Sequence, residues 1–102
     1  MTFGLTIKEA EAIRDVFRSF QEVEEVVIFG SRAIGNFKRA SDIDLAVRGK
    51  NIDLHLLGKM KARLEETIPV PYFFDLVDVG AITQPELIKH IEQYGRVFYK
   101  NR

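Results

Sequence analysis

The sequence predicts one two-layer α+β domain, in which helices pack on one face of a mixed β-sheet. Segments with helical periodicity alternate with short runs of β-branched and aromatic residues. The chain has 102 residues, 46% of them hydrophobic, which suffices for one core but not for two independent ones. Residues 1–102 contain no internal repeat, low-complexity tract or linker, so we expect a single domain.

The first helix is predicted to begin after Thr6. Thr6 and Glu9 have the spacing of a capping box, in which each side chain binds the backbone N–H of the other residue. Apolar residues then recur on one face up to Phe20, near which the helix should end. Residues 26–29 are continuously apolar and stop at Gly30, which indicates a strand buried on both faces.

A basic turn and loop should connect this strand to the next one. Residues 31–41 combine glycine, serine, lysine and arginine, which is typical of a loop with at most one helical turn. Residues 42–47 then alternate in the pattern of a strand. Because strand side chains alternate between faces, Asp42 and Asp44 should share the face opposite the core.

The next helix and strand follow a turn. Residues 54–68 keep one apolar face at helical spacing, and Pro69 and Pro71 should end this helix. Residues 72–79 are rich in aromatic and β-branched side chains, which predicts a third strand.

The chain should close with a helix and a short strand. Thr83 and Glu86 have the spacing of a second capping box with Pro85 in the first turn, which predicts a helix that continues through Leu87, Ile88, Ile91 and Tyr94. Gly95 can end this helix, and residues 97–99 would add a last strand.

Composition excludes several classes of protein. The absence of cysteine excludes disulfides and cysteine-based metal sites and suits a reducing compartment, so a cytoplasmic location is expected. Lys plus Arg and Asp plus Glu both number 15, and this balance argues against general nucleic-acid binding. No apolar run approaches the roughly 20 residues that span a bilayer, so no membrane association is expected.

Aspartates on two predicted strands form a candidate metal site. Asp42 and Asp44 point the same way from one strand and can converge on one hard cation or a close pair. Asp75 lies inside an apolar strand, where a charge is unfavourable unless it is compensated. Asp78 is the alternative third ligand, but Asp75 is the more interior of the two. Such a group of carboxylates favours Mg²⁺ or Mn²⁺, which would offset their repulsion.

Gly30 and Ser31 form a candidate phosphate-binding turn. Gly30 allows close approach of the backbone to a phosphate, and Ser31 adds a hydroxyl donor at the start of a short helical turn. Arg32, Lys38 and Arg39 place positive charge nearby. Together with the aspartates, this turn predicts a pocket for a nucleoside triphosphate and its metal ions.

The joint motif resembles a known superfamily. Gly30-Ser31, then ten residues, then Asp42-Ile43-Asp44, with a further aspartate on a later strand, resembles the DNA polymerase beta-like nucleotidyltransferases. Within them, the stretch GSRAIGNFKRASDIDLAV is similar to the minimal nucleotidyltransferases, the MntA-type antitoxins found beside HEPN-domain proteins. The resemblance covers essentially the whole chain and implies the nucleotidyltransferase fold.

The resemblance also implies an activity and its site. A hydroxyl would attack the α-phosphorus of ATP at a site with two Mg²⁺ ions. The implied acceptor is a tyrosine of a HEPN-type toxin, and its adenylylation would give the protein an antitoxin role. The implied nucleotide-binding residues are Gly30, Ser31, Arg32 and Ser41, and the implied catalytic and metal-binding residues are Asp42, Asp44 and Asp75.

Some alternatives stay open at this point. Ile34 stands where many relatives have an arginine, which weakens the positive field at the phosphate turn. Because 102 residues leave little chain to enclose an acceptor, a partner should supply part of that site, and a homo-oligomer is a further alternative. The alternative function is a binding module that neutralises a HEPN partner by contact alone. His55 and His90 have no second ligand at metal spacing and are predicted to be ordinary helix-surface residues.

Overall fold

The computed structural model describes residues 2–68 and 72–101, and its elements confirm the predicted α+β class. Pro69 and Pro71, which were predicted to end the second long helix, lie outside the described residues. The elements in chain order are α1 (Ile7–Arg18), β1 (Val23–Phe29), α2 (Ser31–Ile34), β2 (Ile43–Gly49), α3 (Leu54–Thr67), β3 (Phe74–Asp78), the 3₁₀ turn η1 (Val79–Ala81), α4 (Pro85–Tyr94) and β4 (Arg96–Lys100).

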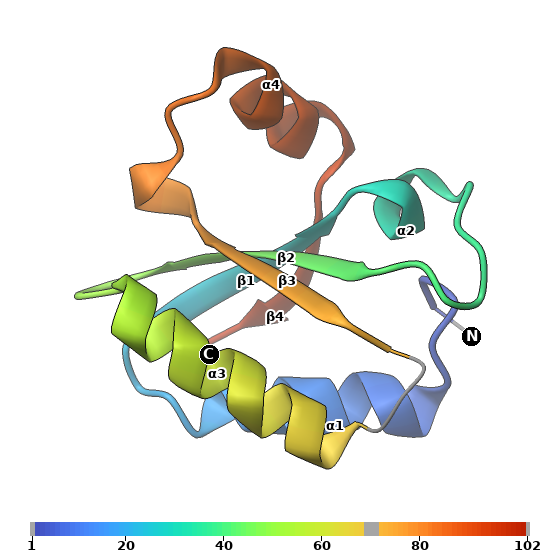
Figure 1. Cartoon of the computed structure of the whole chain (residues 1–102), viewed down its shortest axis with the longest axis horizontal. Coiled ribbons are helices and arrows are strands. Elements are labelled where there is room, and N and C mark those ends of the chain that lie inside the picture. Colours follow the sequence, from blue (N-terminus) through green and yellow to red (C-terminus); the bar gives the residue numbers. More distant parts are fainter. Residues whose placement is uncertain (1, 69–71, 102) are drawn as a thin grey trace.

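The four strands form one mixed sheet in the order β3-β2-β1-β4 (Figure 1). β1 is antiparallel to both β2 and β4, whereas β2 and β3 run parallel. A parallel pair needs a crossover connection, and α3 provides it between β2 and β3. The register of this pair sets Asp44 directly opposite Asp75.

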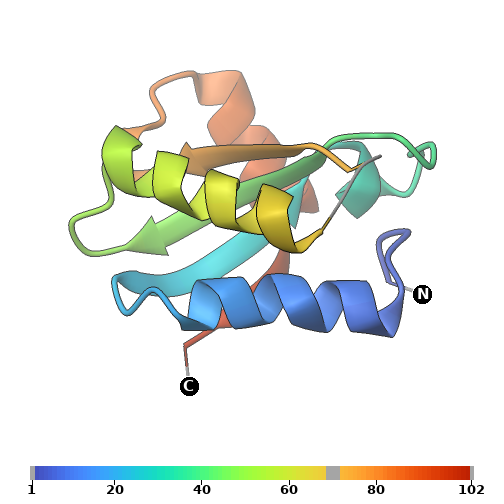
Figure 2. The ribbon, with the colours of Figure 1, turned by 60° about the horizontal axis from the view of Figure 1, so that its bottom comes forward.

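Helices α1 and α3 lie side by side and cover one face of the sheet (Figure 2). Their apolar faces enclose the main core with the strand residues that point the same way, among them Val26, Ile28 and Leu45, all fully buried. The predicted capping box at the start of α1 is present, because Glu9 N–H donates to Thr6 Oγ1 at 3.1 Å and Thr6 N–H donates to Glu9 Oε1 at 2.9 Å.

Helix α4 lies on the opposite face, which corrects the prediction that all helices pack on one side (Figure 1). Val27, Phe29 and Ala46 are buried on that face, and Leu87 and Ile91 of α4 pack against them. The reason lies in β1 itself. Residues 26–29 of β1 are apolar at every position, so this part of the strand presents hydrophobic side chains on both faces of the sheet, and each face needs cover.

Two local predictions about the second half need correction. Helix α4 is capped at Gln84 without a side-chain hydrogen bond, so the capping box predicted from Thr83 and Glu86 does not form. Pro85 at the first helical position fixes this start instead.

No helix among residues 2–68 and 72–101 is long and apolar enough to cross a membrane.

Candidate active site

Three aspartates meet at the edge of the sheet where β2 and β3 begin. Asp44 lies on β2 opposite Asp75 on β3, and Asp42 comes directly before β2. Neighbouring strands lie about 4.8 Å apart, so side chains that face each other across the pair point the same way. Asp44 is half-buried, whereas Asp42 and Asp75 are exposed. The site therefore has one sheltered carboxylate and two that face solvent.

The structure also separates the two candidates for the third carboxylate. Asp75 faces Asp44, whereas Asp78 lies three residues further along β3 and so points to the other face of the strand. Asp78 accepts a hydrogen bond from the Gly80 N–H at 2.9 Å and begins the 3₁₀ turn. Asp75 is thus the residue that the fold brings to Asp44.

Electrostatic repulsion is built into this cluster. The pKa of Asp44 is raised to about 6, first by burial and then by the negative charges of Asp75 and Asp42. Arg32 acts in the opposite direction and lowers the pKa of Asp44. The ionised form of Asp44 is therefore disfavoured in the protein alone, and a cation at this position would relieve the conflict.

Gly30 brings the candidate phosphate-binding turn against Asp44. Its backbone has φ 73°, a left-handed conformation that side chains disfavour, and it directly precedes α2. A Cβ atom at this position would overlap the Asp44 carboxylate. Two independent constraints thus require glycine, and the turn and the aspartates form one site.

His90 belongs to this site and was missed by the sequence reasoning. Gly30 N–H donates to His90 Nε2 at 3.0 Å, and the imidazole is half-buried against the edge of Phe29. This contact corrects its prediction as an ordinary surface residue. A signal existed in the sequence, because residues three and four apart share a helix face, which places His90 with Leu87 and Tyr94.

Ser31 and Ser41 occupy different surroundings near the turn. Ser31 is the first residue of α2 and is half-buried. Ser41 Oγ accepts a hydrogen bond from Lys38 N–H at 2.8 Å and closes the loop before Asp42. A serine hydroxyl that accepts one bond still has its own proton to donate.

Arg32 does not face the site as a phosphate ligand. Its side chain is 2% exposed, and its guanidinium donates to three backbone carbonyls. These acceptors are Phe3 O at 2.8 Å, Arg39 O at 3.0 Å and Ser41 O at 2.9 Å. The structure therefore gives Arg32 a buried role in place of the predicted contact with nucleotide.

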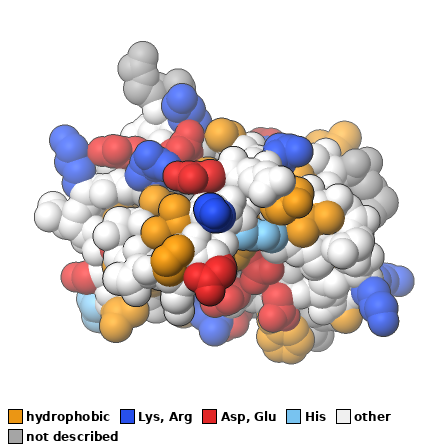
Figure 3. Space-filling view, turned by 90° about the horizontal axis from the view of Figure 1, so that it is seen from above, with side chains coloured by type: hydrophobic (Ala, Val, Ile, Leu, Met, Phe, Trp, Pro, Cys, Tyr) orange, Lys and Arg blue, Asp and Glu red, His pale blue; other side chains and the backbone are white. Residues whose placement is uncertain are grey.

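The chemistry of the donor atoms, and not a preformed cage, supports a metal site here. Among residues 2–68 and 72–101, no three His, Asp or Glu side chains are arranged to hold a metal ion as they stand. The donor set nevertheless suits a hard cation, since it consists of carboxylate oxygens, and burial followed by the charges of Asp75 and Asp42 raises the pKa of Asp44. Acidic side chains gather beside a histidine on the face that Figure 3 shows.

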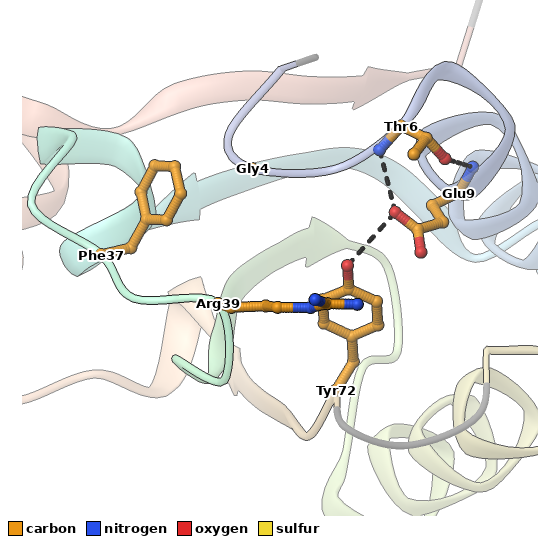
Figure 4. Close-up of a pocket in the computed structure, with 6 residues that line it drawn as sticks. All are labelled: Gly4, Thr6, Glu9, Phe37, Arg39 and Tyr72. Carbon is orange, nitrogen blue, oxygen red and sulfur yellow. Dashed lines mark hydrogen bonds between the residues drawn. The ribbon is translucent and has the colours of Figure 1, made fainter.

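A separate pocket of about 500 Å³ lies beside the N-terminus of α1 (Figure 4). Phe37, Arg39 and Tyr72 line it together with the first residues of the chain and Glu9. Tyr72 Oη donates to Glu9 Oε1 at 3.3 Å, and burial, followed by the charge of Glu9, raises the pKa of Tyr72. None of the three aspartates lines this pocket, so it is distinct from the candidate active site.

Comparison with known families agrees with this geometry. The sequence profile of the polymerase beta nucleotidyltransferases matches residues 11–102, which is most of the chain. The protein belongs to the polymerase beta nucleotidyltransferase family. The resemblance found in the Gly30 to Val47 stretch is thereby confirmed. No curated protein matches the chain.

Solved structures share this nucleotidyltransferase fold. A toxin–antitoxin complex with AMP-PNP has a TM-score of 0.74 and 22% identity, over 91% of this chain and 74% of that chain. The MntA–HepT toxin–antitoxin structure has a TM-score of 0.70 and 18% identity, over 94% and 74% of the two chains. A structure described as a nucleotidyltransferase from Sulfolobus solfataricus has a TM-score of 0.57 and 28% identity, over 90% of this chain and 77% of that chain.

Proposed function

We propose that this family member is an Mg²⁺-dependent transferase that moves AMP from ATP to a hydroxyl acceptor, a tyrosine of a HEPN-type toxin. The observation that carries the proposal is the junction of Asp44 with Asp75 on one side and with Gly30 on the other. This junction sets a phosphate-binding turn against a group of carboxylates. A nucleoside triphosphate with its metal ions needs both parts.

Asp42, Asp44 and Asp75 would hold the metal ions. Bound Mg²⁺ supplies charge neutralisation for the triphosphate and for the in-line displacement at the α-phosphorus. Asp75 is exposed and therefore accessible to an incoming acceptor, so we assign it the acceptor proton. The acceptor oxygen bonds to the α-phosphorus, the bond from the α-phosphorus to the bridging oxygen breaks, and pyrophosphate leaves.

The turn would position the nucleotide. Because Gly30 has no side chain, the backbone before α2 can approach the phosphates, and the Ser31 hydroxyl can donate to a phosphate oxygen. We keep Ser41 as a further candidate donor, since its hydroxyl proton is free to turn toward the nucleotide. Arg32 is omitted from this set because its donors are occupied by backbone carbonyls.

The proposed partner is a HEPN-domain toxin, and the proposed location is the cytoplasm. The fold shared with toxin–antitoxin structures, one of which contains AMP-PNP, supports this proposed partner. The alternative is neutralisation of the partner by contact alone. The clustered carboxylates favour the enzyme, because a surface used only for contact has no need of a destabilised Asp44.

The deciding experiment is intact-mass spectrometry of the toxin that copurifies with the protein, after incubation with ATP and Mg²⁺. We expect an AMP-sized mass gain with the wild type and none with Asp42→Asn. Asp78→Asn is the matched control, because it removes a carboxylate from β3 that points away from the site, and asparagine can keep its turn hydrogen bond. Neutralisation of the toxin without any mass gain would replace the transferase by the contact-only module.

A further inference from the structure

Arg32 is a buried cation held by backbone rather than by acidic side chains. Its guanidinium joins three segments, since it starts from α2 and donates to the N-terminal turn at Phe3 and to the loop at Arg39 and Ser41. Among the described residues, no carboxylate forms an ion pair with it. Burial lowers its pKa, which reflects the unfavourable desolvation of the charge.

Aromatic rings complete the surroundings of this side chain. The rings of Phe37 and Tyr72 lie 5.2 Å and 5.3 Å from the guanidinium carbon, within the range of cation–π attraction. Gly4 packs against the same group, because a Cβ atom there would lie 2.7 Å from Arg32 Nη1 and would overlap Phe37. Figure 4 shows Phe37, Tyr72 and Gly4 around the neighbouring pocket.

We propose that Arg32 is a positioning residue that holds the loop of residues 35–41 and, through it, places Asp42 beside Asp44 for metal binding. This inference rests on the proposed function. Ser41 receives two of the guanidinium hydrogen bonds and directly precedes Asp42, so its carbonyl fixes where β2 begins. The loop itself lies between α2 and β2 and contains no helix or strand of its own to define that position.

The geometry of arginine suits this task better than positive charge alone. Its planar fork holds five N–H donors in fixed directions, whereas a lysine ammonium presents a flexible point charge. Three carbonyls from two chain segments are bound here at once. The N-terminal turn is part of the same arrangement, so a change at Gly4 should reach the metal site without touching an aspartate.

Two variants test the proposal. Arg32→Lys keeps the charge and removes the fork, whereas Gly4→Ala leaves Arg32 in place and pushes a methyl group toward it at a backbone φ of 77°. Leu57→Ala is the control, because it removes a buried side chain of α3 from the main core. Mn²⁺ affinity in the presence of ATP is measured by electron paramagnetic resonance, and exchange of the Lys38 and Ser41 amides is measured by NMR.

We expect both variants to weaken Mn²⁺ binding by about tenfold or more, as loss of supporting contacts does at metal sites. Amide exchange in the loop should accelerate in both, whereas Leu57→Ala should leave loop exchange unchanged relative to the rest of the sheet. If both variants bind Mn²⁺ like the wild type, or if Leu57→Ala loses as much affinity, the positioning role is wrong.

The same measurements separate this inference from the proposed function. Wild-type protein that binds no Mn²⁺ with ATP would overturn the proposed function and, with it, the metal-positioning role. If the wild-type protein binds Mn²⁺ with ATP, but amide exchange in the loop is unchanged in Gly4→Ala and Arg32→Lys, the inference alone would be overturned. The Lys38 N–H and Ser41 N–H bonds, 2.8 Å and 3.0 Å long, are the amides that report this.

Discussion

Replacing Asp44 by asparagine should stabilise the metal-free protein at neutral pH. The pKa of Asp44 is 3.8 in its ordinary state and about 6 in the fold. The folded protein therefore binds this proton more tightly than the unfolded chain does. By proton linkage, Asp44 does not lower the free energy of unfolding below about pH 4, where it is protonated in both states. Its ionisation lowers that free energy as the pH rises through about 6.

The size of the effect follows from the pKa shift. A shift of this size corresponds to at most about 3 kcal/mol, and because Asp44 is partly exposed, solvent screening should reduce the effect to about 1–2 kcal/mol. Asparagine keeps the shape of the side chain and carries no charge. Asp44→Asn should therefore match the wild type at about pH 4 and exceed its free energy of unfolding by that amount above about pH 7.

Urea unfolding without metal, followed from about pH 4 to 8, measures this difference. Asp78→Asn serves as the control, because it removes a carboxylate from β3 that points away from the cluster. Mg²⁺ should reduce the difference in free energy of unfolding between Asp44→Asn and the wild type. It would bind the folded wild type, and a ligand that binds only the folded state stabilises it. A wild type that stays more stable than Asp44→Asn at neutral pH, or a difference that is the same at every pH, would refute the electrostatic reasoning.

Substitutions at three further positions probe the turn. His90→Ala leaves the Gly30 N–H without its acceptor and should cost about 1–2 kcal/mol in urea unfolding, whereas His90→Gln can accept that bond and should recover part of the loss. Ser31→Ala removes one phosphate donor and should weaken ATP binding by about 1–3 kcal/mol in calorimetry, with unfolding unchanged. Gly30→Ala combines a left-handed φ with overlap of the Asp44 carboxylate, so it should lower the free energy of unfolding by about 1–3 kcal/mol and weaken ATP binding. Wild-type values for both quantities would contradict the site geometry.

Local sequence patterns predicted most of the elements because their causes are local. The capping box of Thr6 and Glu9 lies within one turn of helix and forms as expected. The alternation of residues 42–47 likewise predicted a strand, and β2 begins at Ile43 with Asp42 directly before it. The capping box at Thr83 failed because Pro85 determines where α4 begins.

Contacts between segments that are distant in the sequence could not be predicted from these local patterns. The side of the sheet that α4 covers depends on which face of β1 lacks a partner, although the continuous run at residues 26–29 already required apolar cover on both faces. His90 reaches Gly30 across 60 positions of sequence, a contact that no local spacing encodes. Its position on the apolar face of α4 was the available signal.

Arg32 shows most clearly why residue type alone does not decide a role. The resemblance predicts that the basic residue after Gly30 and Ser31 binds phosphate. Whether Arg32 does so depends on the path of the following loop, which decides whether backbone carbonyls lie within its reach. Because the loop brings the carbonyls of Arg39 and Ser41 back over α2, the guanidinium finds its acceptors inside the protein. Its charge still acts on the site, since it lowers the pKa of Asp44 from within. The positive field expected beside the aspartates is therefore supplied in part by a residue that solvent does not reach.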